Sequence, residues 1–375
     1  MKPGLLKVSV VLSVVLAGCS SGSSTSSAPP SISVPSSVLQ TEPTQYGISG
    51  FATTKGSLRP DDMVLAGSSV FVIVQDNNVN PDGTLAKPGA QSMLYKYDQN
   101  GNLLASYNLP GHPDGIALYD ANTLWISTNE DANTQIVVFN ISAGTSHTYS
   151  YDAGTATLPH GGGLDDLKLI NGVVYATASA PVTVPTAQPS SPTYSTDASG
   201  ATGIYGVNTG PVLYAIALNA DGVTYHATPA LMSNITVNSL PSNTPITLNM
   251  TDPDSSAIDP KGNLVISSQQ DSELVVISNV GQPSQSVSVV NMTLYGNPWP
   301  LDDTRWVPAL GATSMLVSDA PGQIIYRITA SAGFVPGTAY SAGQGTVLLS
   351  NTTSGVMTPL FTGLNNPHGI IFLPN

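Results

Sequence analysis

A short acidic motif recurs along this chain, and its side chains are the ones most able to do chemistry. Five copies carry Asp at the second position, and the last copy carries His368 there. We refer to these second residues as the column residues. The copies are Pro60-Asp61-Asp62-Met63, Pro113-Asp114-Gly115-Ile116, Leu164-Asp165-Asp166-Leu167, Pro253-Asp254-Ser255-Ser256, Leu301-Asp302-Asp303-Thr304 and Pro367-His368-Gly369-Ile370.

Carboxylates that converge on one point repel one another unless some of them take up protons or a cation lies among them. Ligands that offer only oxygen suit Ca²⁺ or Mg²⁺ better than Zn²⁺. The sequence therefore predicts a site for Ca²⁺ or another divalent cation and no other cofactor. The expected ligands are first Asp114, Asp165 and Asp254, and then Asp61 and Asp302.

Histidine and tryptophan side chains near the copies are candidates for binding a ligand. His112 comes two residues before Asp114, and His160 precedes the third copy. Together with His368, these imidazoles would favour zinc. Trp299 lies next to the fifth copy and could contact a ligand, although packing in the core is the alternative.

The column aspartates also have a purely structural interpretation. Asp in Pro-Asp-Gly or Asp-Asp sequences accepts hydrogen bonds from nearby backbone N–H groups at turns and at the start of strands. A structural repeat would reproduce this role in every copy. The residues alone leave both interpretations open.

β-Rich runs bounded by Gly, Asn and Asp follow each copy and predict strands. Examples are residues 69–75, 123–128 and 263–268. After the fifth copy, residues 314–319 and 324–328 are the predicted second and third strands. No stretch after residue 20 has the 3.6-residue period of a substantial helix. The chain is therefore expected to be all-β.

Four antiparallel strands per unit, repeated around a ring, make a β-propeller. Six copies predict six four-stranded blades, and five blades are the alternative if the last copy belongs to a different blade. Residues 41–59 could add a strand to the last blade and close the ring. In this fold the column residues would surround one mouth of the central tunnel. The segments Asn129-Glu130-Asp131 and Gln269-Gln270-Asp271 and the residue Asp319 would lie on the same face.

The repeats resemble a known family of propellers. Residues 113–118 followed by Leu124-Trp125-Ile126 look like an NHL-type repeat, and the pattern over most of residues 55–375 is similar to the gluconolactonase/regucalcin-like six-bladed propellers. This resemblance implies a divalent cation at the tunnel mouth, held by a Glu, two Asn and an Asp. The aspartate corresponds to Asp114 or Asp254, Asp165 replaces one Asn, and no residue matches the Glu.

The N-terminus has the layout of a secretory signal peptide. Lys2 and Lys7 precede a short apolar run, and Leu16-Ala17-Gly18-Cys19 resembles the bacterial lipobox. Cys19 is the only cysteine, and the Ser after it implies sorting to the outer membrane. An ordinary signal peptide is the alternative. We expect a signal peptide at 1–18, a lipidated Cys19 with a Ser-rich tether over 19–40, and one propeller domain over 41–375. The protein would be exported and lipid-anchored at the cell envelope.

The composition limits the partners of such a protein. The net charge is −13, and removal of residues 1–18 would take away two lysines and no acid, which makes it −15. A surface of this charge repels nucleic acid. Because there is a single cysteine, no disulfide can form within the chain. The expected partners are the membrane, through the lipid, and a protein, glycan or small molecule.

Three functions follow from these patterns. The leading hypothesis is a lipid-anchored propeller that binds a partner, glycan or small ligand at its acidic mouth, where the long loops 76–92 and 181–211 could shape a pocket. The second is a divalent-metal-dependent hydrolase of a lactone or related ester. The third is a purely structural envelope protein. The sequence does not decide whether the protein is an enzyme.

Overall fold

β-Strands account for all regular secondary structure in the part of the chain that the structure describes. The computed structural model describes residues 32–41, 45–152, 163–179, 194–196, 202–204 and 208–374, all within the unit Ser31–Asn375. These residues contain no helix that could serve as a membrane span. The prediction of an all-β chain is confirmed.

Antiparallel meanders of four strands repeat along the chain. The first consists of β3 (Leu58–Ala66), β4 (Ser69–Asp76), β5 (Ser92–Asp98) and β6 (Leu103–Leu109). The second consists of β7 (Pro113–Asp120), β8 (Thr123–Thr128), β9 (Gln135–Asn140) and β10 (Thr145–Tyr151). The third consists of β11 (Leu164–Ile170), β12 (Val173–Ala178), β15 (Pro211–Leu218) and β16 (Thr224–Met232). Parallel pairing of β10 with β16 joins the last two into one sheet.

Two further meanders carry additional strands at their outer edges. One consists of β19 (Pro253–Ile258), β20 (Leu264–Ser268), β21 (Glu273–Ser278) and β22 (Ser286–Asn291), extended by β17 (Thr236–Leu240) and β18 (Thr244–Thr247). The other consists of β25 (Thr304–Trp306), β28 (Ala339–Gly343), β29 (Thr346–Ser350) and β30 (Val356–Thr362), extended by β23 (Thr293–Leu294), β24 (Asn297–Pro298) and β1 (Leu39–Gln40). A separate hairpin pairs β13 (Tyr194–Thr196) with β14 (Thr202–Ile204).

The remaining sheet joins the two ends of the described chain. Its order is β2 (Tyr46–Thr53), β27 (Ile324–Phe334), β26 (Ala312–Asp319) and β31 (Pro367–Leu373). Residues 41–59 thus supply the strand that closes the ring, as expected. The assignment of 314–319 and 324–328 to the fifth copy was wrong, because β25 pairs with β28 while β26 pairs with β31. The long segment between β25 and β28 contains β26 and β27, which belong to the neighbouring sheet.

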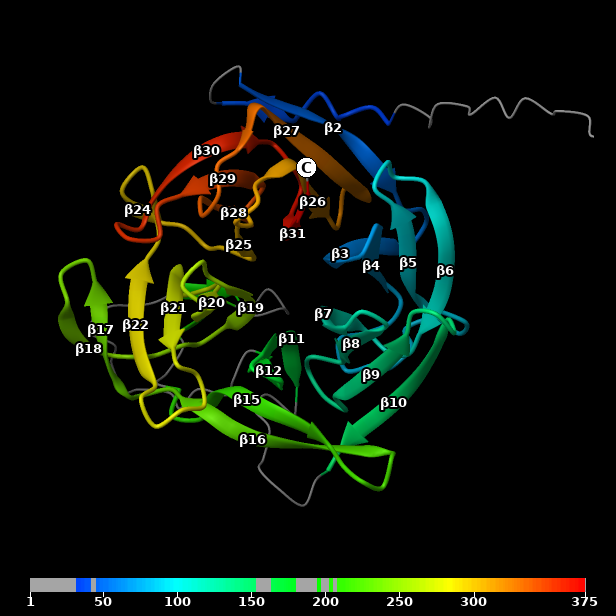
Figure 1. Cartoon of the computed structure of the whole chain (residues 1–375), viewed down its shortest axis with the longest axis horizontal. Helices are drawn as coiled ribbons and strands as arrows, with labels where there is room; N and C mark the ends of the chain where they lie inside the picture. The colour runs from blue at the N-terminus through cyan, green and yellow to red at the C-terminus, as the bar shows by residue number, and fades with distance from the viewer. Residues whose placement is uncertain are drawn as a thin grey trace, which may run out of the picture. The chain divides into compact units, whose positions relative to one another are not determined.

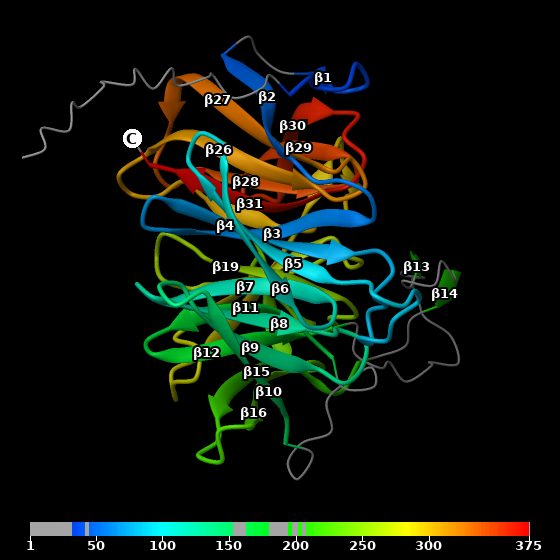
Figure 2. The same cartoon turned by 90° about the vertical axis from the view of Figure 1, so that its right-hand side faces the viewer.

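The sheets surround a central axis, which makes the fold a β-propeller (Figure 1). The strands nearest the axis are β3, β7, β11, β19, β25 and β31. Seen from the side, these inner strands run along the axis (Figure 2). All of them begin at one end of it, and the chain terminus after Leu373 lies at the other. The first residues of each inner strand therefore lie at one end of the axis, and its last residues lie at the other.

The repeated motif coincides with a β-bulge at the start of the inner strand. The pairing between the first and second strands of a meander shifts register there, so that two motif residues lie opposite a single residue of the second strand. The shifts fall between Pro60 and Met63, Pro113 and Ile116, Leu164 and Leu167, and Pro253 and Ser256. A bulge re-aims side chains, which explains why chemically active residues recur at this point.

Apolar side chains fill the space between neighbouring meanders. Phe71 and Leu94 of the first meander pack with Phe139 of the second, for example, and all three are almost completely buried. Ile32, Val34 and Val38 belong to the stretch that the sequence assigns to the tether, yet they pack against the core around Phe361. β1 pairs with β30 beside them.

A candidate cation site at the acidic mouth

The column residues meet at the end of the axis where the inner strands begin, and glutamine amides join them in pairs. Gln75, in β4, donates from Nε2 to Asp61 Oδ2 and to Asp114 Oδ1, both at 3.1 Å. Gln269, after β20, donates to Asp254 Oδ2 at 2.9 Å and to Asp302 Oδ2 at 3.2 Å. Each amide holds together two carboxylates of adjacent meanders.

His368 joins these two pairs into one chain of contacts. Its Nδ1 lies 2.8 Å from Asp302 Oδ2 and 3.4 Å from Asp61 Oδ1, and the amide of Asn366 lies 2.9 Å from its Nε2. Burial alone would lower the pKa of His368, but the charges of Asp302 and Asp61 raise it to about 10. His368 is therefore an imidazolium at neutral pH and neutralises one of the surrounding carboxylates.

Asp165 is the column residue outside this chain of contacts. Its side chain is half-buried, and no described residue donates a hydrogen bond to its carboxylate. Burial, followed by the charges of Glu130 and Asp114, holds its pKa well above the usual value. Because burial disfavours the charged form, an ionised Asp165 requires a compensating charge nearby.

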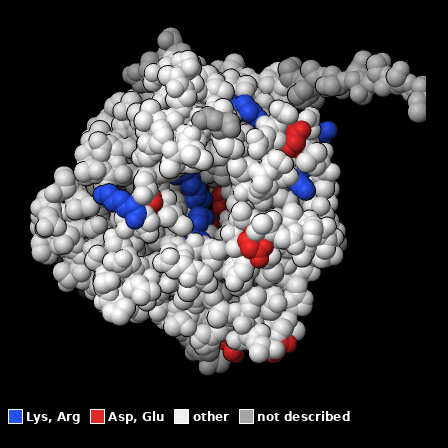
Figure 3. Space-filling model, in the orientation of Figure 1, with Lys and Arg blue, Asp and Glu red and all other residues white. Residues whose placement is uncertain are grey.

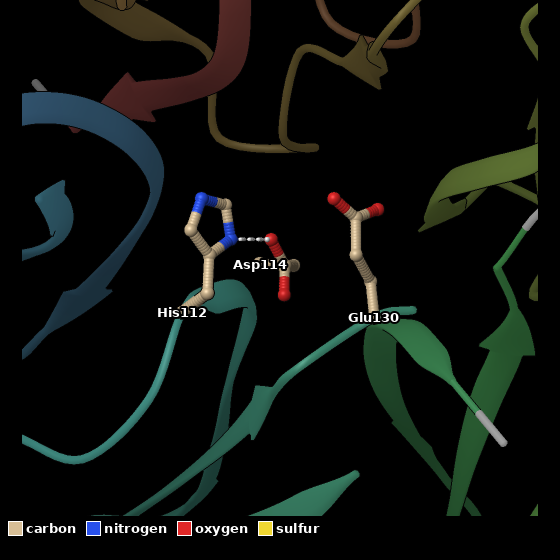
Figure 4. Close-up of side chains that lie close together, drawn as sticks. All are labelled: His112, Asp114 and Glu130. Atoms are coloured by element: carbon tan, nitrogen blue, oxygen red, sulfur yellow. Dashed lines mark hydrogen bonds and ion pairs between the residues drawn. The ribbon is translucent and has the colours of Figure 1, made fainter. Parts of the chain in front are cut away.

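Near Asp165, three side chains form a group that could hold a metal ion. His112 precedes β7, Asp114 lies at its start, and Glu130 follows β8. Possible ligand atoms of all three lie within 4.8 Å of one another, and His112 Nδ1 is 3.0 Å from Asp114 Oδ1. Figure 4 shows the side chains of His112 and Glu130 projecting toward the same space beside Asp114. One imidazole and two carboxylates suit Ca²⁺, Mn²⁺ or Zn²⁺ and leave further positions open.

The electrostatics of this group fit a cation. The Asp114 side chain is only 6% exposed, and its Oδ2 is buried without a hydrogen-bond partner among the described residues. Burial, assisted by neighbouring carboxylates, raises the pKa of Asp114 well above its usual value and that of Glu130 to about 8. Burial lowers the pKa of His112, which favours the neutral imidazole that a metal requires. A cation would supply the charge that these groups lack.

The loop after β8 holds the group in place. Asn129 adopts a left-handed conformation with φ of 68°, its N–H donates to His112 O at 2.7 Å, and its Oδ1 accepts from His112 N at 2.9 Å. The long loop after β4 supports it, since Asp131 N donates to Pro81 O and Asn133 Nδ2 donates to Asp82 O, both at 3.2 Å. His112 and Glu130 are therefore fixed through the same turn.

Only some of the residues that the sequence predicted for the site belong to the three-residue group. Of the ligands expected first, Asp114 belongs to the three-residue group, whereas Asp165 and Asp254 lie outside it. Trp299 packs against the core around Leu301 and donates from Nε1 to Thr346 Oγ1 at 3.3 Å, so its indole serves packing. His160 and Cys19 lie outside the described residues.

Sequence reasoning missed several residues of the mouth. It placed Glu130 and Gln269 on this face without choosing either as a site residue, and it overlooked Gln75 and Asp252. Burial and the charge of Asp271 raise the pKa of Asp252 to about 7. A signal for the two glutamines was present, because each follows the apolar run of a second strand.

A second charged layer lies immediately below the mouth. We call Asp62, Asp166, Asp303, Lys168 and Arg305 the tunnel cluster. Arg305 Nε lies 3.0 Å from Asp303 Oδ2 and its Nη2 lies 3.6 Å from Asp62 Oδ1, while Lys168 Nζ lies 2.7 Å from Asp166 Oδ2. Each carboxylate of this layer therefore faces a fixed cation.

Small residues separate these aspartates. The alternate copies carry Gly115, Ser255 and Gly369 at the same motif position. A Cβ at Gly115 would lie 2.5 Å from the Cα of Asp166, and one at Gly369 would lie 2.8 Å from Asp62 Oδ1. The close approach of neighbouring inner strands thus requires glycine beside each of these two aspartates.

Comparisons with known proteins add little to this picture. No protein-family model and no curated protein sequence matches the chain. Solved structures that align with it include the periplasmic gluconolactonase PpgL of Pseudomonas aeruginosa (13% identity, 88% of this chain and 99% of that chain, TM-score 0.48). Others are virginiamycin B lyase of Staphylococcus aureus (12%, 88% and 100%, 0.37) and glutaminyl cyclase of Myxococcus xanthus (12%, 90% and 97%, 0.37). Likeness at this level carries no argument about the site or the function.

Proposed function

We propose that the protein binds a divalent cation at its acidic mouth and uses the open positions on that cation to hold a partner, glycan or small ligand. The observation that carries this proposal is the half-buried group of His112, Asp114 and Glu130, in which the buried Asp114 Oδ2 lacks a partner among the described residues. A buried carboxylate without a compensating charge is costly, and a cation removes that cost.

The charge of the mouth also restricts the ligand. His368 supplies one positive charge and a divalent cation would supply two more, but the column residues alone include five aspartates. Asp252 and Glu130 add further carboxylates. A ligand would therefore meet a negative surface around the cation, which favours neutral or cationic molecules over free anions.

A pair of glutamate variants tests the proposal. We expect the full-length protein to bind Ca²⁺, Mn²⁺ or Zn²⁺ in calorimetric titrations and to melt at a higher temperature with the cation than with chelator. At a free cation concentration of 100 times Kd, binding should raise the free energy of unfolding by about 2.7 kcal/mol. Glu130→Gln should weaken binding at least tenfold. Glu273→Gln is the matched control, because Glu273 is buried in β21 and is no member of the group.

Two results would overturn the proposal. One is the absence of saturable binding of all three cations. The other is equal weakening by Glu130→Gln and Glu273→Gln, which would indicate that the substitutions act through general stability.

A metal-dependent hydrolase is the second candidate, and a carboxyl group of the mouth that titrates near neutral pH favours it. A divalent cation supplies Lewis acidity toward a carbonyl oxygen. Asp252 is no member of the three-residue group, and with a pKa of about 7 it could hold or release a proton near neutral pH, as a general acid or base must. A screen of aliphatic lactones with the cation-loaded protein tests this candidate. Turnover that is lost in Glu130→Gln and kept in Glu273→Gln would support it, and no turnover of any lactone would exclude this substrate class.

We further infer that the protein is a lipid-anchored component of the bacterial cell envelope with a propeller of six blades. The lipobox-like segment before Cys19 and the Ser-rich residues after it support the anchor and outer-membrane sorting. The four-stranded meanders led by β3, β7, β11, β19, β25 and β31 support the blade count. Fractionation of cells that express Cys19→Ala tests the anchor, since this variant should leave the membrane fraction.

A further inference from the structure

The end of the tunnel opposite the acidic mouth contains a cavity of about 400 Å³. This volume lies in the range of small-molecule sites. Figure 3 looks into the hollow at the centre of the ring, where Lys and Arg atoms lie beside Asp or Glu atoms and the surrounding rim is white. The cavity involves none of the column residues, so it is separate from the candidate cation site.

The inner strands become apolar along the axis from the mouth to this cavity. The column residues come first, and the aspartates of the tunnel cluster follow one position later. The last layer contains only apolar side chains and surrounds the cavity. Its residues are Leu65, Leu118, Leu169, Ile258, Trp306 and Phe372. Ile258 is 43% exposed, which places an apolar side chain at the open rim.

Two cations lie between this apolar lining and the aspartates. Lys168 and Arg305 occupy the layer directly before the apolar one, and both line the cavity. Their side chains are 15% and 13% exposed. A molecule that enters past the apolar rim therefore meets these positive groups before it meets the carboxylates. The carboxylates of Asp62, Asp166 and Asp303 lie behind them, on the side of the acidic mouth.

We propose that this cavity binds an amphipathic monoanion, such as a medium-chain carboxylate, with its chain against the apolar layer and its head group beside Lys168 and Arg305. Burial of a hydrocarbon chain contributes about 0.8 kcal/mol for each CH₂ group. The order of the layers determines the orientation of the ligand, because its negative head group is attracted to Lys168 and Arg305 at the inner end of the apolar layer. Neutral and cationic molecules with the same chain lack that attraction.

Calorimetric titration of the full-length protein with decanoate tests the proposal. Chelator is present throughout, so that a carboxylate cannot bind to a cation at the acidic mouth. We expect one decanoate per chain, bound at least tenfold more tightly than decanol or decylamine. Trp306 lines the cavity, so its fluorescence should change in parallel.

Two glutamate substitutions locate the binding. Ile258→Glu puts a negative charge at the open rim and should weaken decanoate binding at least tenfold. Leu103→Glu is the matched control, because Leu103 is 53% exposed on β6, outside the cavity, and binding should not change. Absence of saturable decanoate binding would overturn the proposal. Equal affinity for decanol or decylamine, or equal effects of the two substitutions, would also overturn it.

Discussion

The acidic mouth and the tunnel cluster are neighbouring layers of the same inner strands, but they handle negative charge in opposite ways. In the tunnel cluster, Asp166 faces Lys168, and Arg305 lies between Asp62 and Asp303. At the mouth, the column aspartates share one imidazolium and two glutamine amides. The tunnel cluster contains cations for its carboxylates, whereas most carboxylates of the acidic mouth have no counter-charge among the described residues.

This difference separates structural acids from candidate functional ones. Two of the three tunnel aspartates also bind the backbone of the next meander, since Asp166 Oδ2 accepts from Ser256 N at 2.7 Å and Asp303 Oδ2 accepts from Ile370 N at 2.8 Å. They fasten neighbouring inner strands together. The carboxylate of Asp165 accepts no hydrogen bond from any described residue, although its backbone carbonyl accepts one from Ser127 Oγ. Its cost to stability is explained if an external cation or ligand offsets it.

The largest effect is expected from the loss of a tunnel cation. Arg305→Met would leave Asp62 and Asp303 buried without their counter-charge, and removing one partner of a buried ion pair costs about 3–5 kcal/mol. Urea denaturation measures this change. Arg59→Met is the control, because Arg59 contacts two nearby backbone carbonyls and the Asn77 amide but no carboxylate, and its effect should stay within about 0.5 kcal/mol. A loss below about 1 kcal/mol in Arg305→Met would remove the contrast between the layers.

The pH dependence of stability should show the imidazolium of the mouth. The pKa of His368 is about 10 in the folded protein, above the value of about 6.5 expected in the unfolded chain. Its contribution is therefore fully present below about pH 6.5 and is lost as the pH rises toward 10, by at most about 1.4 kcal/mol per pH unit. Between pH 7 and 9.5, the wild type should lose more stability in urea denaturation than His368→Asn. Parallel losses in the two proteins would show that His368 is not charged.

A smaller effect of opposite sign should distinguish two adjacent residues. Asp165→Asn removes a charge that Glu130 and Asp114 repel, so it should stabilise the metal-free protein by about 0.5–1 kcal/mol. Asp166→Asn weakens the contacts with Lys168 and Ser256 and should destabilise it by about 1–3 kcal/mol. Melting curves in chelator compare the two. Shifts of the same sign would contradict the distinction between the layers.

The sequence predicted the architecture because its signals are local. The β-rich runs, the turn residues and the recurring motif each lie within a few residues, and together they indicated an all-β propeller. The assignment of 314–319 failed for a physical reason, since β25 pairs with β28 across an insertion that belongs to another sheet. Strand pairing over such a distance leaves no local pattern.

The candidate site was less predictable because its residues meet only in three dimensions. Asp114 could be chosen from its motif, but Glu130 joins it through the turn at Asn129. The choice between Asp165 and Asp166 depends on which carboxylate faces Lys168, and the sequence Asp-Asp does not contain that information. The apolar cavity likewise requires the inner strands to be aligned in layers.

The most direct test of a cation at the mouth is anomalous diffraction from crystals of the full-length protein soaked in Mn²⁺. The group of His112, Asp114 and Glu130 predicts one strong anomalous peak within coordination distance of all three side chains. Crystals of Glu130→Gln should lose that peak, and those of Glu273→Gln should keep it. A wild-type map without a peak at this group would contradict the account.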